Sequence, residues 1–193
     1  MRKLTVITHL TLDGVMQAPG RPDEDTRGGF DRGGWAQAGN DQVMADFMGV
    51  GRGGDPVALL LGRRTYQDFF GFWPQQPDNP YTESLTKQQK YVASRTLAEP
   101  LPWQNSTLLP GDAADAVAAL KQEPGADLVV LGSGELVQSL RPRALVDEYV
   151  LMIHPLIIGR GRRLFPEGAP ADLRLAESVT TTTGVIIGRY QPR

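Results

Sequence analysis

The residues best suited to chemistry in this chain follow a short apolar run. In "LLLGRRTY", residues 59–66, the run ends at Gly62 and continues into Arg63, Arg64 and Thr65. A glycine allows a sharp turn, the first amides of a following helix have no acceptor within that helix, and an arginine can donate two hydrogen bonds to one phosphate. The stretch therefore predicts a phosphate-binding turn.

Two further turns have a similar composition. The sequence "GSG" at residues 132–134 follows the apolar run "LVVL", and its glycines would let the backbone approach a pyrophosphate. Ser94, Arg95 and Thr96 follow the candidate strand "KYVAS". Taken singly, an arginine after a strand is more often a solvated charge, and a glycine there often only caps a helix. Neither the GxGxxG nor the GxxxxGK[ST] pattern is present. Together, the three turns predict a nucleotide site at the edge of a parallel sheet.

The elements that would position these turns alternate between strand and helix. Strands are expected at residues 4–10, 57–61, 90–94, 107–109, 128–131, 148–153, 173–179 and 185–190. Helices are expected at 43–48 (capped by Asn40 and ended by the glycines of 49–54), at 65–70, from Asp112 to before Pro124, and at 135–140. Parallel βαβ units followed by an antiparallel end predict a mixed α/β sheet in a single domain, residues 1–193.

Two long segments lack periodicity, at residues 15–39 and 73–86. A loop of the first length inside a compact domain often covers a functional site. The basic stretch "GRGRR", residues 159–163, is interpreted as a solvated turn because the whole chain carries a net charge of -2.

Composition excludes several classes of function. The chain has 193 residues, 40% of them apolar, which is typical of a globular protein. Its charge of -2 argues against a nucleic-acid partner, and no apolar run approaches the roughly 20 residues that span a bilayer. It contains no cysteine, and its two histidines, His9 and His154, have no partner at ligand spacing, so no metal site is expected. We expect a cytoplasmic protein.

The order of these motifs resembles the dihydrofolate reductase-like superfamily, and more closely its branch related to the reductase domain of bifunctional riboflavin-biosynthesis proteins. The stretches that carry the resemblance are "ITHLTLDGVM", "LLLGRRTYQDF", "KYVASRTL", "LVVLGSGELVQSLR" and "LVDEYVLMIHPLIIGRGRRLF". The resemblance implies a three-layer fold with a central, mixed and mostly parallel sheet of about eight strands, flanked by helices and ending in an antiparallel hairpin. It also implies a homodimer, in which the run "YVLMIHPLII" could form the interface.

The resemblance further implies an NADPH-dependent oxidoreductase whose cofactor lies on the three turns. The turn at Arg63–Thr65 would face the adenosine 2′-phosphate, the turn at Ser94–Thr96 would lie beside the adenosine half, and the turn that begins at Gly132 would face the pyrophosphate and nicotinamide. The implied cofactor-binding residues are Gly62, Arg63, Arg64, Thr65, Ser94, Arg95, Thr96, Gly132, Ser133, Gly134, Glu135, Leu136 and Val137.

Residues for catalysis and substrate binding are expected near the first strand and in the following loop. Asp13 ends that strand beside the expected nicotinamide pocket and is the first candidate for the proton source, although Asp before Gly is also simple turn chemistry. A loop acid or a bound water could serve instead. Candidate pocket residues are Met16, Trp35 and Phe72 as walls, and Asp41 or Asp31 as the partner of a pterin-like ring.

Two positions depart from the riboflavin reductases. Leu131 stands where they typically have a glutamate, and Val15 where a basic residue often follows the TLDG motif. We therefore expect hydride transfer to a small heterocyclic, pterin- or pyrimidine-like substrate. The alternatives are 5-amino-6-(5-phosphoribosylamino)uracil reductase and a non-catalytic nucleotide-binding dimer.

Overall fold

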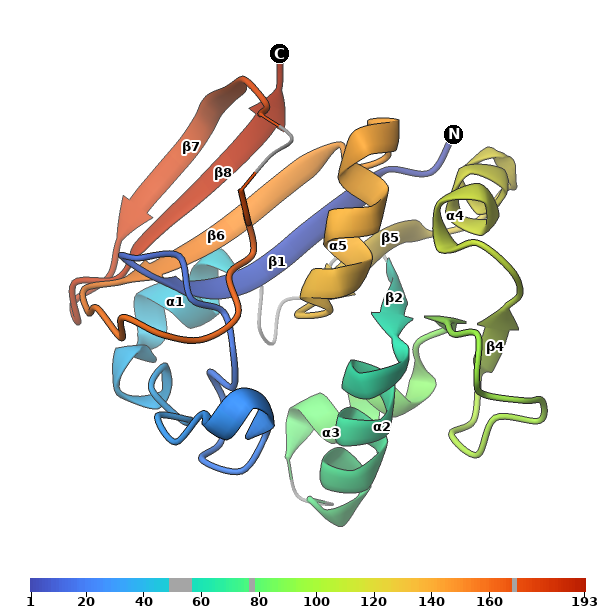
Figure 1. Cartoon of the computed structure of the whole chain (residues 1–193), viewed down its shortest axis with the longest axis horizontal. Coiled ribbons are helices and arrows are strands. Elements are labelled where there is room, and N and C mark those ends of the chain that lie inside the picture. Colours follow the sequence, from blue (N-terminus) through green and yellow to red (C-terminus); the bar gives the residue numbers. More distant parts are fainter. Residues whose placement is uncertain (49–56, 77–78, 168–169) are drawn as a thin grey trace. The chain divides into compact units, whose positions relative to one another are not determined.

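One eight-stranded sheet is the framework of this chain, as a computed structural model describes it for residues 1–48, 57–76, 79–167 and 170–193 (Figure 1). The strands are β1 (Leu4–Thr11), β2 (Val57–Gly62), β3 (Lys90–Ala93), β4 (Ser106–Leu109), β5 (Asp127–Leu131), β6 (Glu148–His154), β7 (Leu173–Thr180) and β8 (Ile186–Pro192). Their order in the sheet is β4-β3-β2-β5-β1-β6-β8-β7. The helices are α1 (Gln42–Phe47), α2 (Arg63–Phe72), α3 (Pro80–Lys87), α4 (Ala113–Gln122) and α5 (Gly134–Leu140). The predicted mixed α/β fold is confirmed.

The described chain forms two compact units. Unit 1 comprises Met1–Thr5 and Asp55–Asp147, and unit 2 comprises Val6–Gly54 and Glu148–Arg193. The boundary falls inside β1, so this strand contributes residues to both units. The expectation of a single domain over residues 1–193 stays a prediction.

Parallel pairing in unit 1 brings three strand ends together. β2 pairs in parallel with β3 on one side, where Gly62 lies opposite Ala93, and with β5 on the other, where Leu59 lies opposite Val129. β3 in turn pairs in parallel with β4. The turns that follow β3, β2 and β5 therefore leave adjacent parallel strands at the same edge, as predicted.

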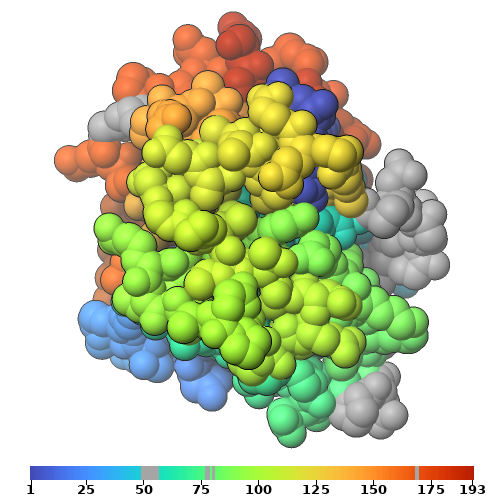
Figure 2. Space-filling model, turned by 90° about the vertical axis from the view of Figure 1, so that its right-hand side faces the viewer, coloured from blue at the N-terminus to red at the C-terminus, as the bar shows by residue number. Residues whose placement is uncertain are grey.

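The core of unit 1 explains why β2 reads as an uninterrupted apolar run. Residues 58–61 are all buried, with alternate side chains on opposite faces of the sheet. Leu59 and Leu61 belong to a cluster with Tyr66 and Trp103. The Tyr66 hydroxyl also accepts a hydrogen bond of 3.0 Å from the buried Trp103 backbone amide. Figure 2 shows the outer surface of the segments from α3 to α4 in this unit.

Lys90 is a fully buried cation at the start of β3. Its ammonium donates to the backbone oxygens of Leu85 at 2.7 Å, Thr86 at 3.2 Å and Gln88 at 2.7 Å. It also lies 4.5 Å from the centroid of the Trp103 ring. Desolvation by burial lowers its pKa from 10.5 to about 8. Lys90 therefore satisfies the carbonyls where α3 ends, which no helical amide can reach.

Antiparallel strands form the C-terminal part of unit 2, again as predicted. β6 pairs with β8, where Tyr149 lies opposite Tyr190, and β8 pairs with β7. Met44 of α1 packs with Val150 and Met152 in a buried cluster.

The long aperiodic segment of unit 2 is packed rather than extended into solvent. Val15, Ala18 and Phe30 form a buried cluster against which Trp35 packs. Within this segment the regular structure consists of two short 3-10 turns, Arg27–Gly29 and Gln37–Gly39. The prediction of a long segment without a helical or strand period is confirmed.

Three expectations about helices were wrong in detail. The segment 73–86 was expected to be irregular, but it contains α3, because the Asn79 side chain accepts from the Tyr81 amide at 2.9 Å and caps the helix. Asp41, not Asn40, caps α1 by accepting from the Met44 amide. α2 begins two residues before Thr65. The glycines of 49–54, expected to end the first helix, and residues 77–78 lie outside the described residues.

Candidate functional site: phosphate-facing turns and the TLDG loop

The first predicted turn places both arginines in the opening turn of α2. Gly62 is the N-cap residue and has no side chain that could accept from the first amides of the helix. Those amides, from Arg63 to Thr65, have no acceptor within the helix, and no acidic residue occupies the first turn. The start of this ten-residue helix is thus suited to an anion.

Ser133 joins this turn to the glycine turn after β5. Its hydroxyl accepts from the Gly62 amide at 3.0 Å and lies 3.0 Å from the Thr65 hydroxyl, to which it can donate. Gly132 and Ser133 both have positive φ, 58° and 50°, so the chain reverses within two residues to begin α5. The two turns are therefore held together by side-chain hydrogen bonds as well as by the pairing of β2 with β5.

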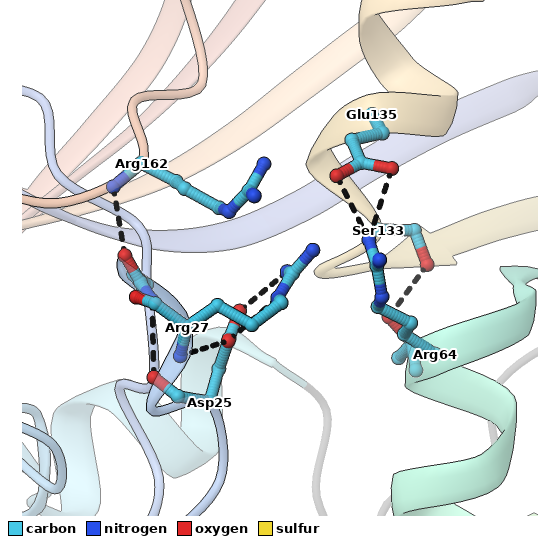
Figure 3. A network of polar contacts seen from close by, with 8 residues as sticks. Asp25, Arg27, Arg64, Ser133, Glu135 and Arg162 are labelled. Atoms are coloured by element: carbon cyan, nitrogen blue, oxygen red, sulfur yellow. Dashed lines mark hydrogen bonds and ion pairs between the residues drawn. The ribbon is translucent and has the colours of Figure 1, made fainter. Parts of the chain in front are cut away.

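An ion pair across the two turns controls the position of Arg64. One guanidinium nitrogen lies 3.0 Å and 3.3 Å from the two carboxylate oxygens of Glu135 (Figure 3). Both side chains are at least half exposed, 50% and 61%, so this pair contributes about 1 kcal/mol or less. Arg63 instead bonds Gln67 one helical turn further along, at 3.1 Å. Arg64 can therefore exchange Glu135 for a stronger anion at small cost.

The third turn is stabilised by its own serine. The Ser94 hydroxyl accepts from the Thr96 amide at 3.1 Å and from the Leu97 amide at 3.0 Å. Arg95 is exposed in this turn. Within unit 1, the three turns thus present Arg63, Arg64 and Arg95 after three adjacent strands. The remaining predicted cofactor residues, Gly134, Leu136 and Val137, form the beginning of α5.

In unit 2, Asp13 is the centre of a compact loop. Its carboxylate accepts from the Thr11 hydroxyl at 2.6 Å and from the amides of Ile158 at 3.2 Å and Gly159 at 2.8 Å. The Thr11 hydrogen bond is the main cause that lowers the pKa of Asp13 below its usual value, with the two amides adding to it. Asp13 is thus a carboxylate near neutral pH, a form that can accept a proton but not donate one. Its catalytic role stays a prediction.

The other predicted substrate residues of unit 2 have clear structural contacts. The Trp35 indole donates to the backbone oxygen of Gln17 at 2.8 Å, and Met16 is 9% exposed. Asp41 caps α1, and its second oxygen accepts from the amide of Thr182 at 2.7 Å and from its hydroxyl at 2.6 Å. Their roles toward a substrate also stay predictions.

The two remaining candidates for the substrate pocket, Asp31 and Phe72, contact other side chains of the protein. Asp31 forms an exposed ion pair with Arg160. Phe72, in unit 1, contacts Trp73 with ring centroids 5.2 Å apart.

The two histidines are partners, although nothing in the sequence indicates it. His9 Nδ1 lies 2.8 Å from His154 Nε2, and the Trp35 ring meets His154 edge-on at 5.3 Å. Burial and the neighbouring His154 lower the pKa of His9 from 6.5 to about 4, and burial lowers the pKa of His154. The residues are 145 positions apart, so sequence spacing could not have revealed the pair.

Acidification from pH 7 to 5 is expected to lower the free energy of unfolding by about 2 kcal/mol through His9. Between pH 6.5 and about 4 the unfolded chain binds more protons than the folded one, so the free energy of unfolding decreases as the pH is lowered through this window. Urea unfolding at both pH values measures the loss. The chain has only two histidines, so the His9→Gln, His154→Gln double variant is the control. An equal loss in that variant would refute the assignment.

The described residues contain neither a cluster of metal ligands nor a membrane-spanning helix. Among those residues, no three His, Asp or Glu side chains gather in a way that could hold a metal ion. Nor do the described helices include one that is long and apolar enough to cross a membrane.

The sequence is similar to a known protein family and to two curated proteins. The family model of the RibD C-terminal domain matches residues 2–187. The uncharacterized protein YyaP of Bacillus subtilis is 28% identical over 192 residues, covering 96% of this chain and 92% of YyaP. The uncharacterized protein YwjB of the same organism is 29% identical over 111 residues, covering 56% and 58% of the two chains.

Two solved structures have the same fold. A putative riboflavin biosynthesis protein from Shewanella sp. PV-4 matches with a TM-score of 0.66 and 21% identity, covering 100% of this chain and 99% of its own. A pyrimidine reductase-like protein from Corynebacterium diphtheriae matches with a TM-score of 0.61 and 16% identity, covering 100% and 92%. The predicted dihydrofolate reductase-like fold is confirmed.

Proposed function

Because the chain belongs to the RibD C-terminal domain family, we propose that it is an NADPH-dependent reductase that transfers hydride to a small pterin- or pyrimidine-like heterocycle. Family membership supports a reductase role, and reductases of this kind generally use a nicotinamide cofactor. The observation that carries the proposal is the set of three polar turns after β3, β2 and β5 in unit 1. Their free helix amides and three arginines form a donor set that fits a dinucleotide phosphate.

Each turn has its own part in holding the cofactor. Arg63 and Arg64 would bind the adenosine 2′-phosphate, because a guanidinium can form a bidentate pair with a phosphate monoester. Residues 94–96 would lie beside the adenosine half, and the glycine turn and the start of α5, residues 132–137, would face the pyrophosphate and nicotinamide. The cofactor supplies the hydride, so the protein has to orient it and exclude water.

The substrate would be handled by residues of unit 2. We assign Met16 and Trp35 to pocket walls, Asp41 to a polar contact with the heterocycle, and Asp13 to proton handling. The low pKa of Asp13 makes its carboxylate a weak base and favours a role in which it accepts a hydrogen bond, with water as the proton source.

Cofactor binding and turnover test the proposal together. We expect tighter binding of NADPH than of NADH by calorimetry, and substrate-dependent loss of reduced-nicotinamide absorbance with one member of a panel of pterins and pyrimidines. The panel includes 5-amino-6-(5-phosphoribosylamino)uracil, whose exclusive turnover would select the riboflavin-pathway reaction. Tight NADPH binding without any turnover would instead favour a non-catalytic nucleotide-binding protein, and equal affinity for both cofactors would reject the 2′-phosphate assignment.

Glu135→Gln is expected to tighten NADPH binding about two- to fivefold. The substitution removes the carboxylate that competes for Arg64, and an exposed pair of this kind contributes about 1 kcal/mol or less. Glu83→Gln is a matched control, because Glu83 forms an exposed pair with Lys87 on α3. Weaker binding in Glu135→Gln would indicate that this carboxylate itself contacts the cofactor.

We further propose a cytoplasmic homodimer. The run "YVLMIHPLII" supplies little free surface for the interface, since Tyr149 and the next three residues are at most 5% exposed. Ile157, at 70% exposed, is the large apolar side chain of this run that remains accessible. Light scattering should give twice the chain mass, and Ile157→Glu should shift it toward the monomer. A monomeric wild-type protein would reject the dimer.

A further inference from the structure

The two histidines of unit 2 form a pair that the proposed reductase chemistry does not use. His9 Nδ1 and His154 Nε2 are 2.8 Å apart, and His154 is 1% exposed. We propose that this pair is a proton-operated latch, which holds residues 35–39 in place while both rings are neutral and releases them when the pair gains a proton. The inference concerns unit 2 alone and does not depend on the reductase function proposed above.

The number of protons on the pair decides which ring nitrogens carry hydrogen. Two neutral imidazoles have two N–H groups among four nitrogens, and one of these protons lies in the hydrogen bond between the rings. The other proton is left for one of the two outer nitrogens, Nε2 of His9 or Nδ1 of His154. A pair with one added proton has three N–H groups. If the hydrogen bond persists, both outer nitrogens then carry a proton.

The outer nitrogen of His154 lies against Gly39. A Cβ added at Gly39 would be 2.6 Å from Nδ1 and 2.5 Å from Cε1 of His154. Among the described residues, His154 Nδ1 has no hydrogen-bond acceptor. A buried N–H group without an acceptor is rare and costly in proteins. The outer proton of the neutral pair therefore lies on the partly exposed His9, and His154 donates to His9.

An added proton disturbs the ring that supports residues 35–39. Either the proton lies on His154 Nδ1, against Gly39, or the hydrogen bond to His9 breaks. The Trp35 ring also packs edge-on against His154, with ring centroids 5.3 Å apart. Protonation therefore weakens both contacts of this segment with His154.

Two further hydrogen bonds attach the same segment to unit 2. The Trp35 indole donates to the Gln17 oxygen at 2.8 Å, and the Thr183 hydroxyl donates to the Gly39 oxygen at 2.8 Å. Each can be exchanged for a hydrogen bond to water at small net cost. The contact with His154 thus decides whether the segment stays attached.

No carboxylate among the described residues bonds either ring. The charged side chains on the elements around the pair all have other partners: Asp13 after β1, Asp41 at the N-cap of α1, Asp46 within α1, Glu148 on β6 and Arg189 on β8. Burial lowers the pKa of both histidines, that of His9 to about 4. The pair is therefore neutral at pH 7 and gains its proton in acid.

Native-state hydrogen exchange of the full chain tests the latch. The amides of Ala36 and Gly39 donate to the backbone oxygens of Pro19 and Ala36, so their protection reports the opening of this segment. With a His9 pKa of about 4 when closed and 6.5 when open, their protection should fall about 20-fold from pH 7 to pH 5. The opening is local, so this exchange should not depend on low concentrations of urea.

His9→Gln with His154→Gln is the matched control. Two glutamine amides can form a similar hydrogen bond but do not titrate, so protection should change by less than about twofold between the two pH values. Three results would overturn the inference. They are an equal fall in this variant, unchanged protection in the wild type, and exchange that depends steeply on urea at both pH values.

Two measurements at pH 7 test the geometry itself. Nitrogen-15 spectra of the imidazoles should show both rings protonated at Nε2, and a proton on His154 Nδ1 would overturn the inference. Gly39→Ala adds a methyl group that overlaps His154, so it should lower the protection of Ala36 about tenfold or more. Unchanged protection would mean that the segment does not depend on His154. If Gly39→Ala does not fold, the pH comparison and the spectra decide.

Discussion

Replacing Arg63 and Arg64 together by alanine is expected to weaken NADPH binding about 100-fold, while NADH binding changes by less than about threefold. Hydrogen bonds to a charged group contribute about 1.5–3 kcal/mol each, and a loss of about 3 kcal/mol corresponds to roughly two powers of ten in affinity. The difference between the two cofactors arises because only NADPH carries the 2′-phosphate. Calorimetry or nicotinamide fluorescence with both cofactors measures it.

The arrangement of the two arginines decides how the single variants should differ. Arg63 follows Gly62 directly and bonds Gln67, whereas Arg64 must leave Glu135 before it can bind a phosphate. The Arg64→Ala loss should therefore be smaller than the Arg63→Ala loss.

Lys87→Ala with Arg143→Ala is the control, because both residues form exposed ion pairs in the same unit. Parallel losses for NADPH and NADH would mean that the arginines contact a group common to both cofactors. An unchanged ratio of the two affinities would contradict the 2′-phosphate assignment.

Replacing Lys90 by methionine is expected to lower the free energy of unfolding by about 3–5 kcal/mol. Methionine fills much of the same volume but cannot donate, so the backbone oxygens of Leu85, Thr86 and Gln88 would lose their shared partner. Each buried acceptor left without a partner costs about 1–3 kcal/mol, and part of the sum is offset by relaxation of the chain and by the Asn105 amide, which lies 3.4 Å from the Thr86 oxygen. Urea unfolding at neutral pH measures the change.

Lys87→Met separates this effect from a general loss of lysine charge. Lys87 is exposed and paired with Glu83 at the end of α3, so its replacement should lower the free energy of unfolding by no more than about 1 kcal/mol. A Lys90→Met protein as stable as the wild type would mean that relief from desolvation equals the value of the hydrogen bonds.

The pH dependence of the free energy of unfolding gives a second test of the role of Lys90. Its folded pKa of about 8 lies below the unfolded value of 10.5, so between about pH 8 and pH 10.5 the unfolded chain binds more protons. The stability contribution of this residue therefore rises with pH from about 8, and that rise should be absent in Lys90→Met.

The local features of the fold were largely predictable from sequence. The run 57–61 followed by Gly62 indicated a buried strand and a turn, and the register of β2 with β3 and β5 brings the three polar turns to one edge as expected. Such features depend on neighbouring residues and on the rules of parallel pairing. The beginning of α3 was missed because Asn79-Pro80 is typical both of a turn and of a capped helix start.

Features that depend on distant residues were not predictable. The sequence predicted Lys90 only as the edge of a strand, and its burial depends on carbonyls at the end of α3. The GRGRR turn is exposed, as predicted, but nothing in its sequence indicates that Gln17 binds it to the 25–27 segment. For Asp13 the sequence offered both a catalytic and a turn-forming role, and the contacts with Thr11, Ile158 and Gly159 give the second a clear physical basis.

The distribution of tryptophans gives the chain a built-in optical reporter. The three tryptophans divide unequally, with Trp73 and Trp103 in unit 1 and Trp35 in unit 2. Trp35 also touches the His154 ring, whose protonated form quenches indole emission by accepting an excited-state electron. A chain that retains only Trp35 would therefore report the unfolding of unit 2 separately. Comparison with a chain that retains only Trp73 and Trp103 would reveal whether the two units lose their structure in one step or in two.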